Sequence, residues 1–208
     1  MTLLQSGIAK PSSGYDIEQS LRFDDGDSAY MTRTPLSAGN QKTWTYSGWI
    51  KKGNDVTEQL FTTDVGTTST TYGSIALHSS GYFYVGEYSQ NFRQTTQLFR
   101  DPGAWYHFVV AFDTTESTGS NRVKVYVNGE QITDFSTSND PTQDADYAWN
   151  NTNRHDIGSE KGTGNFFDGY MAEVHFIDGQ ALTPASFGET NSATNQWVPR
   201  SRGFNIRY

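Results

Sequence analysis

Three aspartates in one short segment offer the most direct metal-binding chemistry in the chain. Asp24, Asp25 and Asp27 lie in the run Asp-Asp-Gly-Asp, between two stretches rich in strand-forming residues. Calcium prefers six to eight oxygen ligands, and closely spaced carboxylates supply several of them. An acidic turn between strands is also common without a metal. The residues leave two interpretations open, a calcium site at these aspartates or a solvated turn.

Aromatic side chains beside amide and acidic groups offer a second chemistry, the binding of sugars. The chain has 5 Trp, 12 Tyr and 13 Phe. Tyr147 and Trp149 fall in a long polar segment, 136–154, and loops on a rigid scaffold commonly carry binding residues. Tyr84 and Tyr88 lie in an aromatic run with acidic and amide neighbours. These four residues are the candidates for carbohydrate binding, and the alternative is that they cover a sheet or contact another subunit.

The histidines give no clear sign of catalysis or of a metal site. None of the four is two or four residues from another, which is the spacing typical of metal ligands. His107 lies within an aromatic strand, so we expect a hydrogen-bonded histidine inside a sheet. Composition leaves a Ser-His-Asp triad open, but the chain has no Gly-x-Ser-x-Gly elbow.

The elements that must position these residues are predicted to be short β-strands. From residue 20 onward, β-branched and aromatic runs alternate with clusters of Gly, Asn, Asp, Ser and Thr. The predicted strands are 20–23, 29–33, 43–51, 58–63, 72–78, 81–87, 94–99, 105–113, 121–128, 130–135, 154–159 and 168–178. Helical signals are confined to one short turn at 183–188. The pattern predicts an all-β fold, an antiparallel two-sheet β-sandwich of the jelly-roll kind with terminal arms.

Alternation within the strands predicts which side chains share one face of a strand. Three predicted stripes are formed by Val123, Val125 and Val127, by Trp44, Tyr46, Gly48 and Ile50, and by Tyr170, Ala172, Val174 and Phe176. Tyr126 is predicted on the face opposite the valines. Segment 105–112 is almost continuously apolar, which predicts a central strand covered on both faces. Asn128-Gly129 predicts a two-residue hairpin turn, because both positions favour positive φ.

Charge and composition exclude several classes of function. The 208-residue chain has a formal net charge of -8, so we expect no nucleic-acid partner. It has no cysteine, which excludes disulfides, thiolate metal sites and cysteine nucleophiles. No segment approaches the roughly 20 apolar residues of a membrane span, and residues 1–7 lack the features of a signal peptide. We expect a soluble protein made in a cytoplasm and not inserted in a membrane.

Several segments resemble laminin-G-like, concanavalin A-like domains. They are TWTYSGWIK at 43–51, WYHFVVAFD at 105–113, VKVYVNG at 123–129 and FDGYMAEV at 167–174. The likeness covers residues 18–188 and implies a concanavalin A-like jelly roll. It also implies that calcium is a possible cofactor, held by loop carboxylates such as Asp24, Asp25 and Asp27, and no other cofactor is expected.

Glucanases of the resembling fold use a Glu-x-Asp-x-(x)-Glu set on one strand, which brings two carboxyl groups about 5–5.5 Å apart for retaining hydrolysis. The nearest run here is Glu173-x-His175 with Asp178, where a histidine replaces the middle aspartate and the spacing differs. We therefore expect a binding protein that is not an enzyme, with glycan hydrolase as the last alternative.

The phrasing of some segments resembles bacteriophage structural proteins, especially those of marine phages. These segments are SAY at 28–30, RTP at 33–35, and residues 94–101 and 169–189. The resemblance implies a virion protein, a capsid decoration or a tail fibre or appendage, assembled in the host cytoplasm. Its expected partners are other virion proteins, sister copies in a homo-oligomer and host-surface glycans. The alternative is a soluble carbohydrate-binding lectin.

The chain is predicted to have three parts. Residues 1–18 form an N-terminal arm, 19–189 the jelly-roll domain and 190–208 a C-terminal tail. The tail carries apolar residues beyond the last family-like strand. Trp197, Phe204 and Tyr208 are the candidates for docking on a partner subunit or on the particle.

Overall fold

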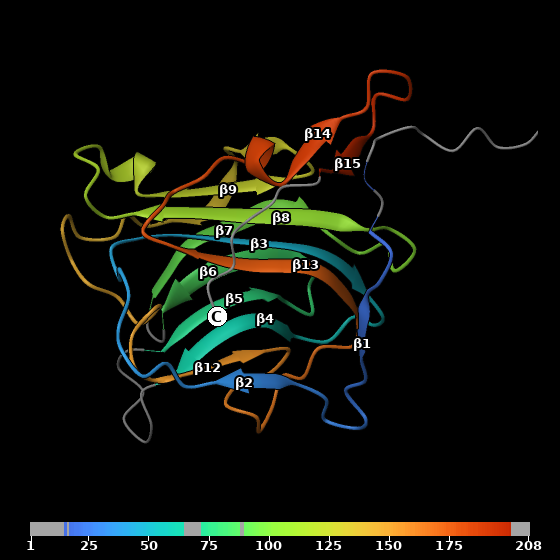
Figure 1. The fold of residues 1–208 in the computed structure, drawn as a ribbon, viewed down its shortest axis with the longest axis horizontal. Coiled ribbons are helices and arrows are strands. Elements are labelled where there is room, and N and C mark those ends of the chain that lie inside the picture. The colour runs from blue at the N-terminus through green and yellow to red at the C-terminus, as the bar shows by residue number, and fades with distance from the viewer. Residues whose placement is uncertain (1–14, 16, 65–71, 88–89, 201–208) are drawn as a thin grey trace, which may run out of the picture.

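Strands dominate the computed structural model, which describes residues 15, 17–64, 72–87 and 90–200. Within these ranges the chain forms two large antiparallel sheets packed face to face, and a small two-stranded sheet lies at one side (Figure 1). The helical segments described are two short 3₁₀ turns, η1 (Gly119–Asn121) and η2 (Pro184–Ser186). The predictions of an antiparallel two-sheet β-sandwich and of a short turn at 183–188 are both confirmed.

Sheet A has six strands, in the order β1 (Leu21–Phe23), β13 (Gly169–Asp178), β3 (Thr43–Lys52), β8 (Tyr106–Asp113), β9 (Val123–Val127) and β10 (Glu130–Ile132). Strand β8 lies between β3 and β9, and its residues 107–112 are all buried. This confirms the central strand predicted from the apolar run, since both of its faces are covered. Asn128 and Gly129 join β9 to β10 with φ angles of 50° and 87°, as the hairpin prediction required.

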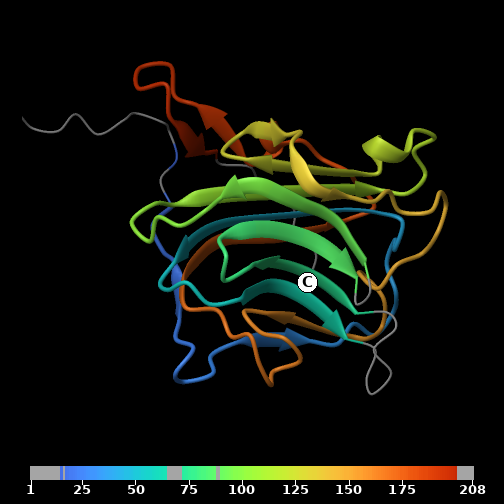
Figure 2. The ribbon, with the colours of Figure 1, turned by 180° about the vertical axis from the view of Figure 1, so that it is seen from behind.

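Sheet B has seven strands, in the order β11 (Phe135–Ser138), β7 (Gln90–Leu98), β6 (Tyr82–Glu87), β5 (Gly73–Leu77), β4 (Glu58–Asp64), β12 (Arg154–Ile157) and β2 (Met31–Arg33). Figure 2 looks onto this sheet from the side opposite to Figure 1. The single strand predicted at 130–135 is wrong, because β10 belongs to sheet A and β11 to sheet B. The chain crosses between the sheets at the exposed residues 133–134.

Aromatic rings fill most of the space between the two sheets. Trp44 of β3 stacks on Phe112 of β8 with ring centroids 4.7 Å apart, and Phe83 of β6 stacks on Phe108 at 4.5 Å. Trp44, Tyr46 and Ile50 of one predicted stripe are all fully buried. Large rings remove about 150–250 Å² each from water, so this layer supplies much of the hydrophobic stabilisation.

A bulge in β13 reverses the predicted alternation of its side chains. The pairing of β13 with β3 shifts after Ala172, and Glu173 has a φ of 47°. Met171 therefore lies in the core with 2% of its surface exposed, while Ala172 faces outward opposite Trp49. A bulge adds one residue to a strand, so residues on its two sides no longer share a face by simple alternation. The predicted stripe of 170–176 is wrong on the N-terminal side of the bulge.

The outer face of sheet A is covered by the chain that follows β13. Phe187, just after η2, packs on Val109, Ala111 and Tyr126 in a second, smaller core. Tyr126 is thus buried, although it lies on the face opposite the valines of β9 as predicted. Strands β14 (Gly188–Thr190) and β15 (Trp197–Pro199) form a hairpin beside this core (Figure 1). The boundary predicted between residues 189 and 190 falls inside that hairpin.

Among the residues described, no helix is both long and apolar enough to cross a membrane.

Candidate functional site

The outer face of sheet B brings a tyrosine together with polar side chains from neighbouring strands. Alternate residues of β6 point into the core, so Tyr82 and Tyr84 point outward. Gln59 of β4 donates from Nε2 to the Tyr84 hydroxyl over 3.3 Å, and Ser74 of β5 lies 3.4 Å from the same hydroxyl. The Ser74 hydroxyl also donates to Gln59 Oε1 over 2.6 Å. This network fixes the position of the Tyr84 side chain, one of the predicted binding residues.

Further aromatic and amide groups extend this surface. The rings of His78 and Tyr82 stack at 4.4 Å with an interplanar angle of 6°, and Tyr82 lies 6.2 Å from Tyr84. Gln94 of β7 is the cross-strand partner of Tyr84. Burial, with a smaller contribution from Tyr84, raises the pKa of Tyr82, so its hydroxyl keeps its proton. We call the half-buried residues His78, Tyr82, Tyr84 and Gln94 the sheet-B face; Gln59 and Ser74, which position Tyr84, are themselves buried.

The long segment predicted to bind sugars contains one half-buried and one fully buried aromatic residue. Trp149 is 0% exposed and packs on Trp44 at 5.0 Å. A side chain with no exposed surface does not contact a ligand, so Trp149 is a core residue and is not retained as a binding residue. Tyr147 is half-buried against Phe92, and its hydroxyl accepts a hydrogen bond from the Thr142 amide over 2.9 Å. Tyr88, also predicted to bind, lies outside the described residues.

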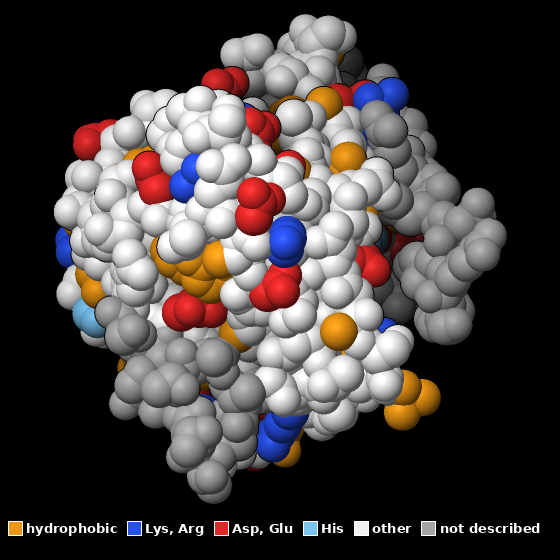
Figure 3. Space-filling model, turned by 90° about the vertical axis from the view of Figure 1, so that its left-hand side faces the viewer, with side chains coloured by type: hydrophobic (Ala, Val, Ile, Leu, Met, Phe, Trp, Pro, Cys, Tyr) orange, Lys and Arg blue, Asp and Glu red, His pale blue; other side chains and the backbone are white. Residues whose placement is uncertain are grey.

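Tyr147 lines a pocket of about 290 Å³ between loops at one end of the sandwich. The polar side chains of this pocket come from Gln41, Glu87, Asp146 and Asn151. Burial raises the pKa of Glu87 to about 7, although a 3.2 Å hydrogen bond from the Ala148 amide opposes the shift. Figure 3 faces this end and shows acidic side chains around a small apolar patch. The pocket therefore combines an aromatic ring with carboxyl and amide groups, a second arrangement suited to a sugar.

Three carboxylates meet beside β1, at the opposite end of the sandwich. Asp24 and Asp25 follow β1, Asp168 precedes β13, and one oxygen of each lies within 4.8 Å of the others. The register of β1 on β13 pairs Phe23 with Gly169, which places Asp24 beside Asp168. The cluster shares Asp24 and Asp25 with the set proposed from the sequence, but it contains Asp168 and does not contain Asp27.

The chemistry of this carboxylate cluster fits calcium. Carboxylate oxygens are hard ligands of the kind that calcium prefers. Burial, followed by the charges of Asp25 and Asp24, raises the pKa of Asp168. When bound, calcium would supply positive charge that offsets the repulsion among the three carboxylates.

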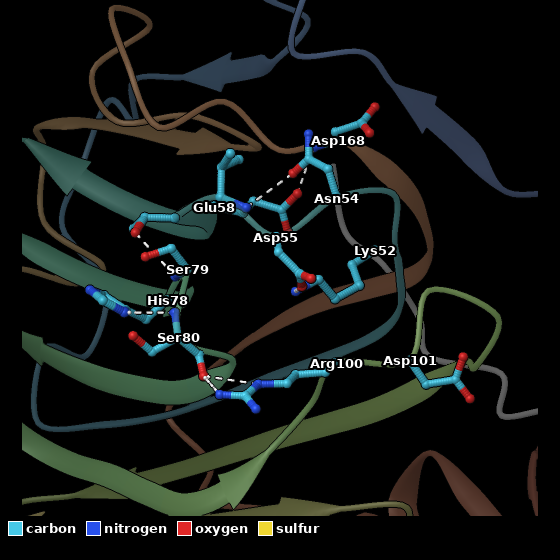
Figure 4. Close-up of polar contacts among 12 residues, drawn as sticks. Lys52, Asn54, Asp55, Glu58, His78, Ser79, Ser80, Arg100, Asp101 and Asp168 are labelled. Atoms are coloured by element: carbon cyan, nitrogen blue, oxygen red, sulfur yellow. Dashed lines mark hydrogen bonds and ion pairs between the residues drawn. The ribbon is translucent and has the colours of Figure 1, made fainter.

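Glu58 lies next to this cluster with its carboxyl group buried. Its Oε1 accepts a hydrogen bond from the Asp168 amide over 3.2 Å, and its Oε2 has no hydrogen-bond partner among the described residues. Desolvation raises the pKa of Glu58 to about 8. The Asp168 carboxylate points away from Glu58, while Lys52 pairs with Asp55 over 2.7 Å (Figure 4). The Glu58 carboxyl group is therefore protonated and uncharged near pH 7. Glu58 is not a member of the carboxylate cluster.

A buried serine–histidine pair does not have the geometry of a catalytic dyad. His107 Nδ1 accepts a hydrogen bond from Trp197 Nε1 over 3.0 Å, so the neutral ring carries its proton on Nε2. That nitrogen lies 2.9 Å from Ser47 Oγ and donates to it. A catalytic base must instead accept the serine proton. Burial, with a smaller contribution from His175, lowers the pKa of His107 to about 3, and the prediction of a hydrogen-bonded sheet histidine is confirmed.

Trp197, predicted to dock on a partner, packs on its own domain. Its ring lies over two glycines, and a Cβ at either Gly129 or Gly188 would come within 2.5 Å of an indole carbon. Because neither glycine has a side chain, the half-buried indole packs directly against both of them. Phe204 and Tyr208 lie outside the described residues, so partner contacts by this tail stay a prediction.

This arrangement of two sheets and surface sites defines a jelly-roll β-sandwich of the lectin type. The chain belongs to the concanavalin A-like lectin/glucanases superfamily, whose Laminin_G_3 model matches residues 24–186. No curated protein is similar enough to this chain to count as a match.

Two solved structures resemble this chain at low sequence identity. Domain 4 of AbnA, an extracellular arabinanase from Geobacillus stearothermophilus solved with arabinotriose, is 22% identical over 72% of this chain and 66% of that chain, with a TM-score of 0.50. A heptameric SAP-like pentraxin from Limulus polyphemus is 20% identical over 74% and 71% of the two chains, with a TM-score of 0.48. The likeness to the arabinanase domain concerns the fold alone.

Proposed function

We propose that the domain binds carbohydrate on the sheet-B face. The observation that carries this proposal is the arrangement around Tyr84, where the half-buried Tyr82 and Tyr84 rings lie beside the half-buried Gln94 amide. A flat aromatic ring packs against the apolar face of a sugar, and a few placed polar groups bind its hydroxyls. The hydrogen bonds through Gln59 and Ser74 hold Tyr84 in place before a ligand arrives, which lowers the entropy cost of binding.

Membership in a superfamily of lectins and glucanases supports a role on carbohydrate. Because the fold hosts both binding and hydrolysis, the choice between them depends on the residues of the site. We propose that this domain binds without cleaving.

The carboxyl pair to test for hydrolysis is Glu87 and Asp146, which line one pocket. Glu87 has the raised pKa of about 7 that suits a general acid. We expect no release of reducing sugar from a polysaccharide panel. Release by the wild type that disappears in Glu87→Gln would contradict the non-enzymatic proposal.

Isothermal titration tests binding at the sheet-B face. The probes are arabino-, xylo-, manno- and gluco-oligosaccharides, the first because a domain of the same fold was solved with arabinotriose. Tyr84→Ala removes a central ring, and we expect a loss of affinity of at least about tenfold. Tyr170→Ala is the matched control, because Tyr170 is an exposed tyrosine on the other sheet. Equal affinities for Tyr84→Ala and wild type would refute this site.

We further propose that the domain is displayed on a bacteriophage particle, as a capsid decoration or a tail fibre or appendage that contacts host glycans. The support is the resemblance of residues 28–30, 33–35, 94–101 and 169–189 to phage structural proteins. Antibody-labelled electron microscopy of particles from producing cells tests it. Label on the virion is expected, and label found free in the medium would favour a soluble lectin.

A further inference from the structure

A second pocket with aromatic walls lies on the opposite side of the sandwich from the sheet-B face. It has a volume of about 290 Å³ and opens where the chain entering β1, the β7–β8 loop and β15 meet over sheet A. Its walls include Glu18, Gln19, Ser20, Trp49, Trp105 and Pro199. We call it the Trp105 pocket. Its size is just below the range of small-ligand pockets, about 300–1,000 Å³, so it has room for a single sugar ring.

Two indoles form the apolar part of the Trp105 pocket. Trp49 points outward from β3 and stacks on His107 at 4.8 Å with an interplanar angle of 22°, which fixes its ring. Trp105 directly precedes β8 and keeps 38% of its surface exposed. The other four tryptophans of the chain are buried or half-buried. A large exposed apolar side chain at the edge of a pocket is typical of a binding surface.

The polar part of the pocket comes from the segment that enters β1. Glu18, Gln19 and Ser20 are exposed and offer a carboxylate, an amide and a hydroxyl along one wall. Such groups exchange hydrogen bonds with neutral hydroxyls, whereas an apolar peptide would leave them unpaired. The pocket thus combines the fixed indole of Trp49 and the exposed indole of Trp105 with polar side chains on one wall. This combination suits a ligand that has one apolar face and hydroxyl groups around its edge.

We propose that the Trp105 pocket is a second carbohydrate site, which holds a single sugar ring against Trp105. It shares its ligand class with the proposed function but none of its residues. Trp49 faces outward from sheet A and Tyr84 outward from sheet B, so the two sites lie on opposite faces of the sandwich (Figures 1 and 2). One short oligosaccharide does not reach both sites. A single domain therefore links two glycan chains, which raises avidity on a dense glycan surface.

Tryptophan fluorescence separates the two sites, because the sheet-B face contains no tryptophan. The same arabino-, xylo-, manno- and gluco-oligosaccharides are titrated to about 10 mM, which detects dissociation constants in the millimolar range. We expect at least one probe to shift the emission of wild type and of Tyr84→Ala. In Trp105→Ala the shift is lost, and in Gln19→Ala the apparent affinity falls several-fold. Far-ultraviolet circular dichroism checks that both variants keep the β-fold.

The other outcomes distinguish failure of the second site from failure of the sheet-B face. No emission change with any probe, or an unaltered change in Trp105→Ala, overturns the second site. Loss of all binding in Tyr84→Ala also overturns it while supporting the sheet-B face. Binding that depends on Trp105 alone supports the second site and refutes the sheet-B face.

Acrylamide quenching tests whether the pocket is open in the full chain. An open pocket gives stronger quenching in wild type than in Trp105→Ala, because Trp105 is the most exposed tryptophan. Equal quenching would mean that another part of the chain fills the pocket, and this also overturns the proposal.

Discussion

Replacing Glu58 with glutamine removes one buried ionisable group and keeps an oxygen that accepts the hydrogen bond from the Asp168 amide. Burial raises the pKa of Glu58 from 4.5 to about 8. The unfolded chain releases this proton near pH 4.5, whereas the folded chain holds it to about pH 8. The stability that the neutral carboxyl group contributes is therefore fully present below pH 4.5 and is lost as the pH rises toward 8.

The size of the effect follows from the pKa difference. One pKa unit corresponds to about 1.4 kcal/mol, so wild type loses about 2–3 kcal/mol relative to Glu58→Gln between about pH 5 and pH 7. Groups that titrate equally in both proteins cancel from this difference.

Urea unfolding at three pH values in this range measures the free energy of unfolding of both proteins. Glu130→Gln, on the exposed strand β10, is the matched control for the loss of an acidic side chain. The reasoning is refuted if the difference between wild type and Glu58→Gln does not change with pH, or if the variant loses stability relative to wild type as the pH rises.

Three further changes probe other parts of the structure. Asp25→Asn removes one carboxylate of the cluster beside β1, so it should reduce the rise in melting temperature that millimolar calcium gives to wild type, and an equal rise in both would contradict a calcium site there. Trp197→Phe removes the donor to buried His107 Nδ1 and should lower the free energy of unfolding by about 1–3 kcal/mol; an unchanged urea midpoint would contradict this. Gly169→Ala should cost about 3 kcal/mol or more, because its φ is 139° and a Cβ would lie 2.1 Å from a backbone oxygen. Gly179→Ala has a φ of 72° with no atom within 4 Å and should cost only about 1 kcal/mol, so equal losses in thermal unfolding would refute the steric argument.

The parts of the fold that local patterns govern were predictable from the sequence. The Asn128-Gly129 hairpin followed from two adjacent positions that favour positive φ. The burial of β8 on both faces followed from its unbroken apolar run. Trp44 and Tyr46 lie in the core because strict alternation holds over that stretch of β3.

The parts that depend on strand order and register were not predictable in this way. Asp168 joins Asp24 only because β1 pairs with β13, and nothing local connects residues so far apart in the sequence. Gln59 and Ser74 reach Tyr84 because β4, β5 and β6 are neighbours in sheet B.

Two further features could not be predicted from the local sequence pattern. The bulge at Glu173 has no glycine or proline to indicate it, so the stripe predicted along 170–176 is wrong. Trp149 lies in a polar segment, yet its ring packs on both Trp44 and Phe112 in the core, with centroids 5.0 Å and 5.5 Å away.

The position of the β14–β15 hairpin brings two segments that are far apart in the sequence together on one side of the domain. Ile17, where the chain enters, and Pro199, near the end of the described part, line the same pocket over sheet A, as Figure 1 also shows for the segments beside β15. These two segments, near the limits of the described part, are thus neighbours on one side of the sandwich. A domain with adjacent ends can be inserted into a surface loop of a host protein without forcing the two halves of that loop apart. In such an insertion sheet B would point away from the host protein, and the sheet-B face would be exposed to solvent.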